Sequence, residues 1–242
     1  MDNLNFKYSF KLEDGSEENF EFIVNAETLR LVIDTPQDPP AWINLEYHQC
    51  PNCPLDSKTT PHCPLALNIA PVVERFSRVL SYENVYVKAI ENSRTTSQET
   101  SAQMGVSLLI GLLIAASGCP FTAFLKPMVL FHLPFATEEE TLWRATSTYL
   151  LAKYYLKNKG CNPEIELKGL SEIYENIGLV NVAIINRLQA ATEKDTTLNA
   201  LVVLDVFATS LSLEVEEFWA ENEHIFMPFL KSCIEKEEKK IN

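Results

Sequence analysis

Residues 48–66, HQCPNCPLDSKTTPHCPLA, constrain the fold more than any other stretch of the chain. Four prolines fall in this stretch, and proline interrupts helices and strands because it has no backbone N–H. The stretch also carries Cys50, Cys53 and Cys63, each followed directly by proline. It is therefore expected to form a polar loop that holds three thiols.

A fourth cysteine, Cys119, repeats the Cys-Pro step after the apolar part of the chain. Four thiolates are the number that tetrahedral zinc or a four-iron cluster requires. We expect Cys50, Cys53, Cys63 and Cys119 to form one metal site, with a structural role and with zinc favoured. An iron-sulfur cluster stays open, because the same Cys-Pro steps occur beside cluster ligands.

Three histidines lie near these cysteines in the sequence. His48 and His62 flank the loop, and imidazole is able to ligate zinc or to donate a hydrogen bond to a ligand. His132 lies in an apolar segment between Pro127 and Pro134, soon after the fourth cysteine. It is expected to be either a hydrogen-bonded core histidine or a neighbour of the metal that acts as a ligand, an acid-base group or an orienting donor.

A thiol-based reaction is the alternative function. The segment CPNC, residues 50–53, resembles the active-site motif of thioredoxin-like reductases, in which the first cysteine attacks as a thiolate. Cys50 would then be the nucleophile and His132 would assist it. No βαβ pattern precedes the motif, and no Gly-rich phosphate loop or Ser-His-Asp set is present, so whether the protein is an enzyme stays open.

Composition and charge narrow the class of partner. The chain has 242 residues, 46% of them hydrophobic, which is enough for one sizeable core, and we expect a single domain over 1–242. The formal net charge of −13 disfavours nucleic acid and anionic membranes, because like charges repel. A basic protein or a small molecule is the expected partner. The first residues carry no basic and apolar leader, so the cytoplasm is the expected compartment.

The periodicity of the apolar residues predicts an α+β fold. Alternating aromatic residues over 5–34 indicate a small antiparallel meander within 1–45, with a turn at Asp14-Gly15. Residues 46–66 form the cysteine loop, and 67–242 are expected to be mainly helical, with one strand near 85–90 added to the sheet.

Residues 100–125 carry no charged side chain and approach the length of a membrane span. Ser117, Gly118 and Pro120 interrupt the segment, so a buried core helix is expected. Thr96 and Glu99 would form a capping box before it. The preceding helix, whose apolar stripe begins at Leu65, is expected to start near Pro71.

Further helices follow along the rest of the chain. Thr137 and Glu140 predict a second capping box, and an apolar stripe over 170–188 predicts a long helix. A helix over 196–211, capped by Asp195, is apolar on nearly every face and is expected at the centre of a bundle. The last helix is expected at roughly 215–234, followed by a solvated tail.

Other charged residues suggest weaker sites. Glu140 and Arg144 are spaced for an ion pair, with an anion site at Arg144 as the alternative. Glu221-x2-His224 resembles the ligand motif of ferritin-like di-iron bundles, but the required second pair is missing. Asp205 lies alone on an apolar helix and must find a partner if it is buried.

Taken together, HQCPNCPL, HCPLA, SGCPF, PMVLFHLPF and EEETLWRATSTYLLAKYY resemble an uncharacterised family of bacterial proteins. This family has CPxCP, HCP, SGCP and FHLPF motifs, and the resemblance spans residues 45–158. It implies that Cys50, Cys53, Cys63, Cys119 and His132 belong to one pattern. It implies no activity, because none is assigned to the family.

Overall fold

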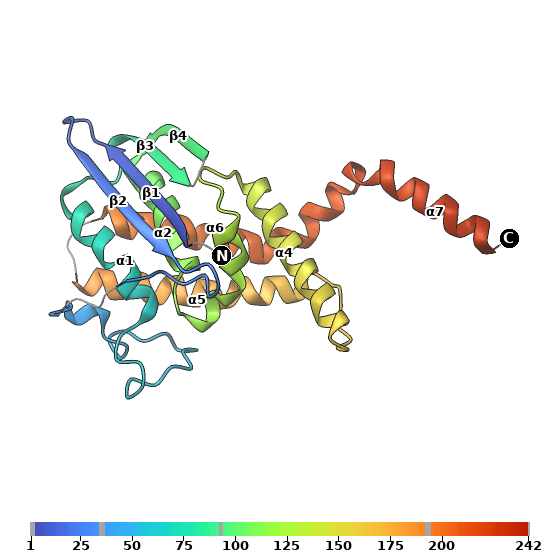
Figure 1. Ribbon diagram of the computed structural model, residues 1–242, viewed down its shortest axis with the longest axis horizontal. Helices are drawn as coiled ribbons and strands as arrows, with labels where there is room; N and C mark the ends of the chain where they lie inside the picture. Colours follow the sequence, from blue (N-terminus) through green and yellow to red (C-terminus); the bar gives the residue numbers. More distant parts are fainter. Residues whose placement is uncertain (1–2, 34–36, 92–93, 192–194, 242) are drawn as a thin grey trace.

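Four antiparallel strands form one sheet, as the computed structural model shows for the described residues, 3–33, 37–91, 94–191 and 195–241. The strands are β1 (Leu4–Lys11), β2 (Glu17–Val24), β3 (Asn84–Glu91) and β4 (Arg94–Ser101), in the order β2-β1-β3-β4. Alternate side chains of β1 are buried, because successive residues of a strand face opposite sides. The α+β class is confirmed, with the helices following mostly after the sheet (Figure 1).

The expected strand at 85–90 is present and pairs with β1. The capping box expected at Thr96 and Glu99 is wrong, because both residues lie in β4. The sequence of β4, RTTSQETS, is polar throughout and therefore shows no alternation of apolar and polar residues. Pairing with β3 therefore decides its conformation.

Within the range 5–34 expected to form the meander, the described residues after β2 form a turn and no further strand. The Asn25 side chain accepts hydrogen bonds from the backbone N–H groups of Glu27 and Thr28, which bends the chain. Leu31 then forms one isolated bridge with Val24 and donates its N–H to the carbonyl of Ala116, beyond the sheet.

Helix α2 (Ala102–Ala115) is the core helix expected from the uncharged segment. It crosses the buried face of the sheet at Gly105, where a Cβ atom would lie only 2.7 Å from Val87 Cγ2. Glycine therefore allows the helix and the sheet to approach closely. Because ten residues of α2 are buried, its apolar composition is explained by the protein core.

Helix α1 (Pro64–Arg75) starts earlier than expected and continues through Pro71. Pro64 occupies the first helical position, where its missing N–H costs nothing. The cost of Pro71 is offset by a buried apolar face that includes Leu65, Ile69 and Val72. Short 3-10 segments are η1 (Ala41–Ile43), η2 (Phe76–Arg78), η3 (Pro120–Leu125) and η4 (Glu223–Ile225).

The remaining helices are α3 (Lys126–Leu130), α4 (Glu138–Asn158), α5 (Lys168–Ala191), α6 (Thr196–Glu221) and α7 (Met227–Ile241). The capping box of Thr137 and Glu140 is confirmed at the start of α4. The expected long helix is confirmed as α5. The Asp195 side chain forms no cap hydrogen bond and instead accepts from the Ser81 hydroxyl.

Helix α6 is less central than expected. One face packs inward through Ala200, Leu201 and Ala208, whereas Val206 and Leu213 are exposed. By length and composition alone, α6 is apolar enough to cross a membrane, and 28% of its most apolar window is buried. The bent pair formed by α2 and residues 120–130 passes the same test when it is taken as one span. Core helices of soluble proteins also have these properties.

The last helix, expected at roughly 215–234, is wrong in its bounds, because α6 continues through Glu221 and α7 runs from Met227 to Ile241, into the segment expected as a tail. Helix α7 projects away from the rest of the molecule, at the end opposite the cysteine loop (Figure 1).

Candidate functional site

The turn around Cys50 and Cys53 is held by a backbone hydrogen bond, 3.0 Å from Cys53 N to Cys50 O. Inside the turn, Asn52 Nδ2 donates to Asn176 Oδ1 on α5 at 3.0 Å. The CPNC turn is therefore attached to the helical part of the fold, although a hundred residues and more separate the two asparagines in sequence.

The other two cysteines have matching local structures. Cys63 is the residue before α1 and Cys119 the residue before η3; both have extended backbone conformations. The proline that follows each, Pro64 or Pro120, occupies the first turn of the helical segment. The repeated Cys-Pro step is thus explained by helix initiation, because proline is favoured at that position.

These two steps lie against each other. A Cβ atom placed on Gly118 would be 3.3 Å from Pro64 Cβ, so the residues preceding Cys119 and following Cys63 are in van der Waals contact. Cys63 N also donates to Ile43 O at 2.8 Å, which ties the end of the loop to η1. The fold therefore joins the cysteine loop to the end of α2, as the metal hypothesis requires.

Arg187 on α5 is a functional candidate that the sequence analysis missed. Its side chain is almost fully buried, and its Nη1 and Nη2 atoms donate to the carbonyls of Trp42, Asn44 and Leu45 at 2.5, 2.6 and 3.2 Å. Its Nε has no hydrogen-bond partner among the described residues, and none of their carboxylates lies within 4 Å. A signal was available: Arg187 lies seven residues after Val180, on the apolar stripe of α5.

The ionisation behaviour of the cysteines and Arg187 is coupled. Burial raises the pKa of the Cys50 thiol to about 12; Cys63, Cys119 and Cys53 add to the rise, and Arg187 opposes it. Burial likewise raises the pKa of Cys119. Burial lowers the pKa of Arg187, while the nearby Cys63, Cys50 and Cys53 raise it. All four thiols and one buried cation therefore share one electrostatic environment.

The thiols do not form a coordination sphere as they stand. In the described part of the chain, no group of three or more histidine, cysteine or acidic side chains has the geometry to hold a metal ion. All six cysteines are free thiols, and Cys161 and Cys233 lie outside the region described above. Metal binding therefore remains a hypothesis that rests on the donor set and its surroundings.

The flanking histidines make no hydrogen bond to a cysteine among the described residues. His48 is exposed, has a positive φ of 46° and packs edge-on against Tyr47. His62 is half-buried and forms an isolated bridge with Asn44. Neither histidine therefore has an observed role at the thiols.

His132 belongs to a different environment, where its Nε2 lies 2.5 Å from the hydroxyl of Tyr8. Burial raises the pKa of Tyr8, with Glu91 adding to the rise, so the phenol keeps its proton. Burial, and secondarily Arg144, lowers the pKa of His132 to about 3, so its ring is neutral at pH 7. The Tyr8 hydroxyl and His132 Nε2 share one hydrogen bond, and the tautomer of the ring sets its direction. This is the hydrogen-bonded core histidine that was one of the two expectations.

The structure also places the charged residues that suggested weaker sites in the sequence. Glu221 and His224 are both exposed, and the His224 ring contacts the Glu221 backbone carbonyl. Burial raises the pKa of Asp205, and a hydrogen bond from Asn181 opposes the rise, which identifies Asn181 as the partner that the sequence did not reveal. The Glu140 carboxylate accepts from Thr137 N instead of pairing with Arg144.

Comparison with known families matches residues 6–227 to a domain of unknown function, DUF6901. Because the match covers most of the chain, the protein belongs to this family, and the family carries no assigned activity. No curated protein and no solved structure matches the chain.

Proposed function

We propose that this member of the DUF6901 family binds one zinc ion through Cys50, Cys53, Cys63 and Cys119, and that the ion has a structural role. Four thiols are a complete donor set for tetrahedral zinc. A structural zinc stabilises a fold because its binding free energy is realised only when the ligands converge. Here the ion would connect the cysteine loop to the junction of α2 and η3.

The observation that carries this proposal is the buried cation beside the thiols. Arg187 has no carboxylate within 4 Å among the described residues, and the groups that raise its pKa are Cys63, Cys50, Cys53 and Tyr47. A buried guanidinium is costly unless a negative charge compensates it. Four thiolates around one Zn²⁺ carry a net charge of −2, half of which Arg187 would neutralise.

The contact between Gly118 and Pro64 also supports the proposal. It brings the Cys-Pro step at the end of the cysteine loop against the step that contains Cys119, so closure of the site requires local adjustment and not rearrangement of the fold. In a reducing cytoplasm, which we propose as the compartment, free thiols stay available to a metal.

The burial of Cys50 argues against a thiol-based reaction. A nucleophilic cysteine needs a low thiol pKa, whereas burial and the neighbouring thiols raise the pKa of Cys50 to about 12. His132 would not assist it, because the His132 ring is hydrogen-bonded to Tyr8. An iron-sulfur cluster uses the same four cysteines and is therefore distinguished by experiment.

Metal analysis of protein purified without oxygen tests the proposal. We expect colourless protein with one zinc per chain. Brown protein that contains iron and sulfide would establish a cluster in place of zinc, and protein with neither metal, even after addition of zinc under reducing conditions, would refute the site.

Single cysteine variants test the ligand set. Cys119→Ser is expected to lose zinc and thermal stability together, because it removes the ligand that joins the loop to α2. Cys161→Ser is the matched control, since Cys161 is exposed and lies outside the site. If Cys119→Ser retains a full complement of zinc, Cys119 is not a ligand and the four-cysteine site is wrong.

A further inference from the structure

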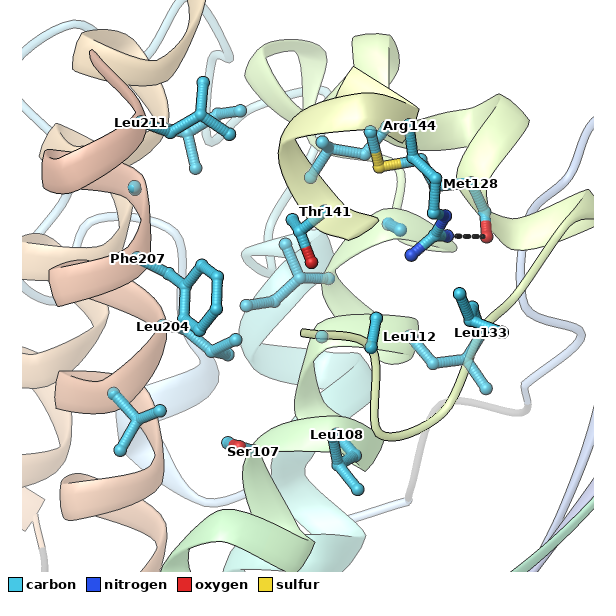
Figure 2. A pocket seen from close by; sticks show the side chains of 18 of the residues that line it. Ser107, Leu108, Leu112, Met128, Leu133, Thr141, Arg144, Leu204, Phe207 and Leu211 are labelled. Atoms are coloured by element: carbon cyan, nitrogen blue, oxygen red, sulfur yellow. Dashed lines mark hydrogen bonds between the residues drawn. The ribbon is translucent and has the colours of Figure 1, made fainter. Parts of the chain in front are cut away.

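A second site lies among the helices, where residues from α2, α4, α5, α6 and the segment 128–136 surround a cavity of about 210 Å³. Most of the lining side chains are aliphatic or aromatic. Figure 2 shows Phe207, Leu204 and Leu211 of α6 on one side, with Leu108, Leu112 and Leu133 across from them. An apolar cavity of this kind accepts the hydrocarbon part of a small ligand.

Arg144 of α4 is the only charged side chain among the described residues that line this cavity. Its Nη2 donates to the backbone carbonyl of Met128 at 3.2 Å, as Figure 2 shows, and to that of Phe131 at 3.1 Å, which fixes the guanidinium beside the cavity. Nη1 and Nε form no hydrogen bond with a described residue, and no described carboxylate lies within 4 Å. One edge of the guanidinium thus has donors to offer to a ligand.

Two acidic residues act on Arg144 from a distance, but neither forms a pair with it. Glu140 and Glu91 raise its pKa, and burial, the largest influence, lowers it. The carboxylate of Glu140 is engaged with the start of α4, and Glu91 Oε1 has no hydrogen-bond partner among the described residues. The half-buried cation therefore lacks a direct counter-ion within the described chain.

Tyr174 of α5 provides a second donor in the same lining. The residue is 7% exposed, and burial raises the pKa of its phenol, so the hydroxyl keeps its proton. Its hydroxyl has no hydrogen-bond partner among the described residues, and its charge state is coupled to Arg144. A guanidinium and a phenol that border one apolar cavity form a suitable receptor for a single carboxylate.

The volume of the cavity limits the length of the ligand's hydrocarbon chain, and its charge limits the kind of head group. At roughly 30 Å³ for each group the size of a water molecule, 210 Å³ holds a chain of about seven carbon groups. A single cation favours a singly charged head group over a phosphate, which would require more donors. The net charge of −13 further disfavours a highly charged anion.

We propose that the cavity between α2, α4, α5 and α6 binds a medium-chain monocarboxylic acid, with its carboxylate on Arg144 and Tyr174 and its hydrocarbon chain against the leucines and Phe207. This site is separate from the cysteine region and does not depend on a metal. The Arg144 guanidinium supplies charge and direction, and the aliphatic wall supplies most of the buried contact area.

Titration calorimetry with octanoate and with 1-octanol tests both parts of the site. The wild-type protein is expected to bind octanoate at least about tenfold more tightly than octanol, since the two share a chain and differ in the charged head. Equal binding of the two, or no binding of octanoate at millimolar concentration, would overturn the proposal.

Variants at Arg144 identify the head-group contact. Arg144→Gln keeps a polar side chain with an amide donor but removes the charge. It is expected to weaken octanoate binding by about tenfold or more and to leave octanol binding within about twofold. Arg78→Gln, at an exposed arginine outside the cavity, is the matched control and should change neither.

Tyr174→Phe provides a variant that preserves the ring and the packing against Phe124. It is expected to weaken octanoate binding by about threefold to tenfold, consistent with the loss of one hydrogen bond to a charged group, and it decides the question if Arg144→Gln fails to fold. Unchanged octanoate binding in a folded Arg144→Gln protein would refute the assigned head-group site. If Arg144→Gln does not fold, unchanged octanoate binding in Tyr174→Phe would refute it.

Discussion

Replacement of Arg187 by methionine is the perturbation that most directly tests the architecture of the cysteine region. Methionine is shorter and has no donor, so the carbonyls of Trp42 and Leu45 lose their hydrogen bond, whereas Asn44 O still accepts from Tyr47 N. A buried carbonyl without a hydrogen bond costs about 1–3 kcal/mol, which gives a gross loss of about 2–6 kcal/mol for two.

Part of this loss is recovered, because the variant no longer buries a charge. The penalty for burying one ion is several kcal/mol, so the net loss is smaller than the upper end of the gross range. We therefore expect the free energy of unfolding to fall by about 2–4 kcal/mol. For a protein of this size, each 1 kcal/mol lowers Tm by about 2–4 °C, so Tm should fall by about 4–16 °C.

Thermal and urea unfolding monitored by circular dichroism measure this change, with Arg78→Met as the control at an exposed arginine. Each protein is measured with zinc and with a chelator. If Arg187 also balances the charge of a metal-thiolate site, Arg187→Met should destabilise the zinc-loaded protein more than the chelated one. A change below about 1 kcal/mol in both conditions would refute the view that Arg187 anchors the loop.

Three further predictions concern the fold. Thr137→Ala removes the capping box of α4 and should cost about 1 kcal/mol in urea unfolding; no change would show that the cap is not needed. Gly105→Ala should lower the free energy of unfolding by about 1–2 kcal/mol, because overpacking against Val87 exceeds the gain in helix propensity. In Gly111→Ala the new Cβ would lie 3.7 Å from its nearest neighbour, so this variant should be as stable as wild type or more stable. Similar effects of the two substitutions in urea unfolding would contradict this reasoning. Burial lowers the pKa of His132 to about 3 in the folded protein, below its value of about 6.5 in the unfolded chain. Its contribution to stability is therefore complete above about pH 6.5 and is lost as the pH falls toward 3. The free energy of unfolding should fall by up to about 1.4 kcal/mol per pH unit in this range. The difference between the stability curves of wild type and His132→Gln measures this slope, and parallel curves would refute it.

Local sequence patterns determined much of the secondary structure. The alternation of Phe6, Tyr8 and Phe10 predicted β1, and the Thr137 capping box predicted the start of α4, because both depend on residues a few positions apart. The same kind of pattern failed for β4, whose polar sequence resembles the start of a helix. Its strand conformation depends on hydrogen bonds to β3, and a local pattern does not report them.

The candidate sites were likewise only partly predictable from local sequence patterns. The Cys-Pro steps were visible in the sequence and suggested a metal site, but their place at the starts of α1 and η3 was not predicted, because the helix after the loop was expected to begin near Pro71. Only the tertiary structure brought Gly118 against Pro64, and Arg187 against carbonyls in and just after η1, more than 140 residues away in the chain. The cavity at Arg144 likewise requires four helices to pack together. Sequence periodicity records which face of an element is apolar, whereas the partner of that face is decided by packing over the whole chain.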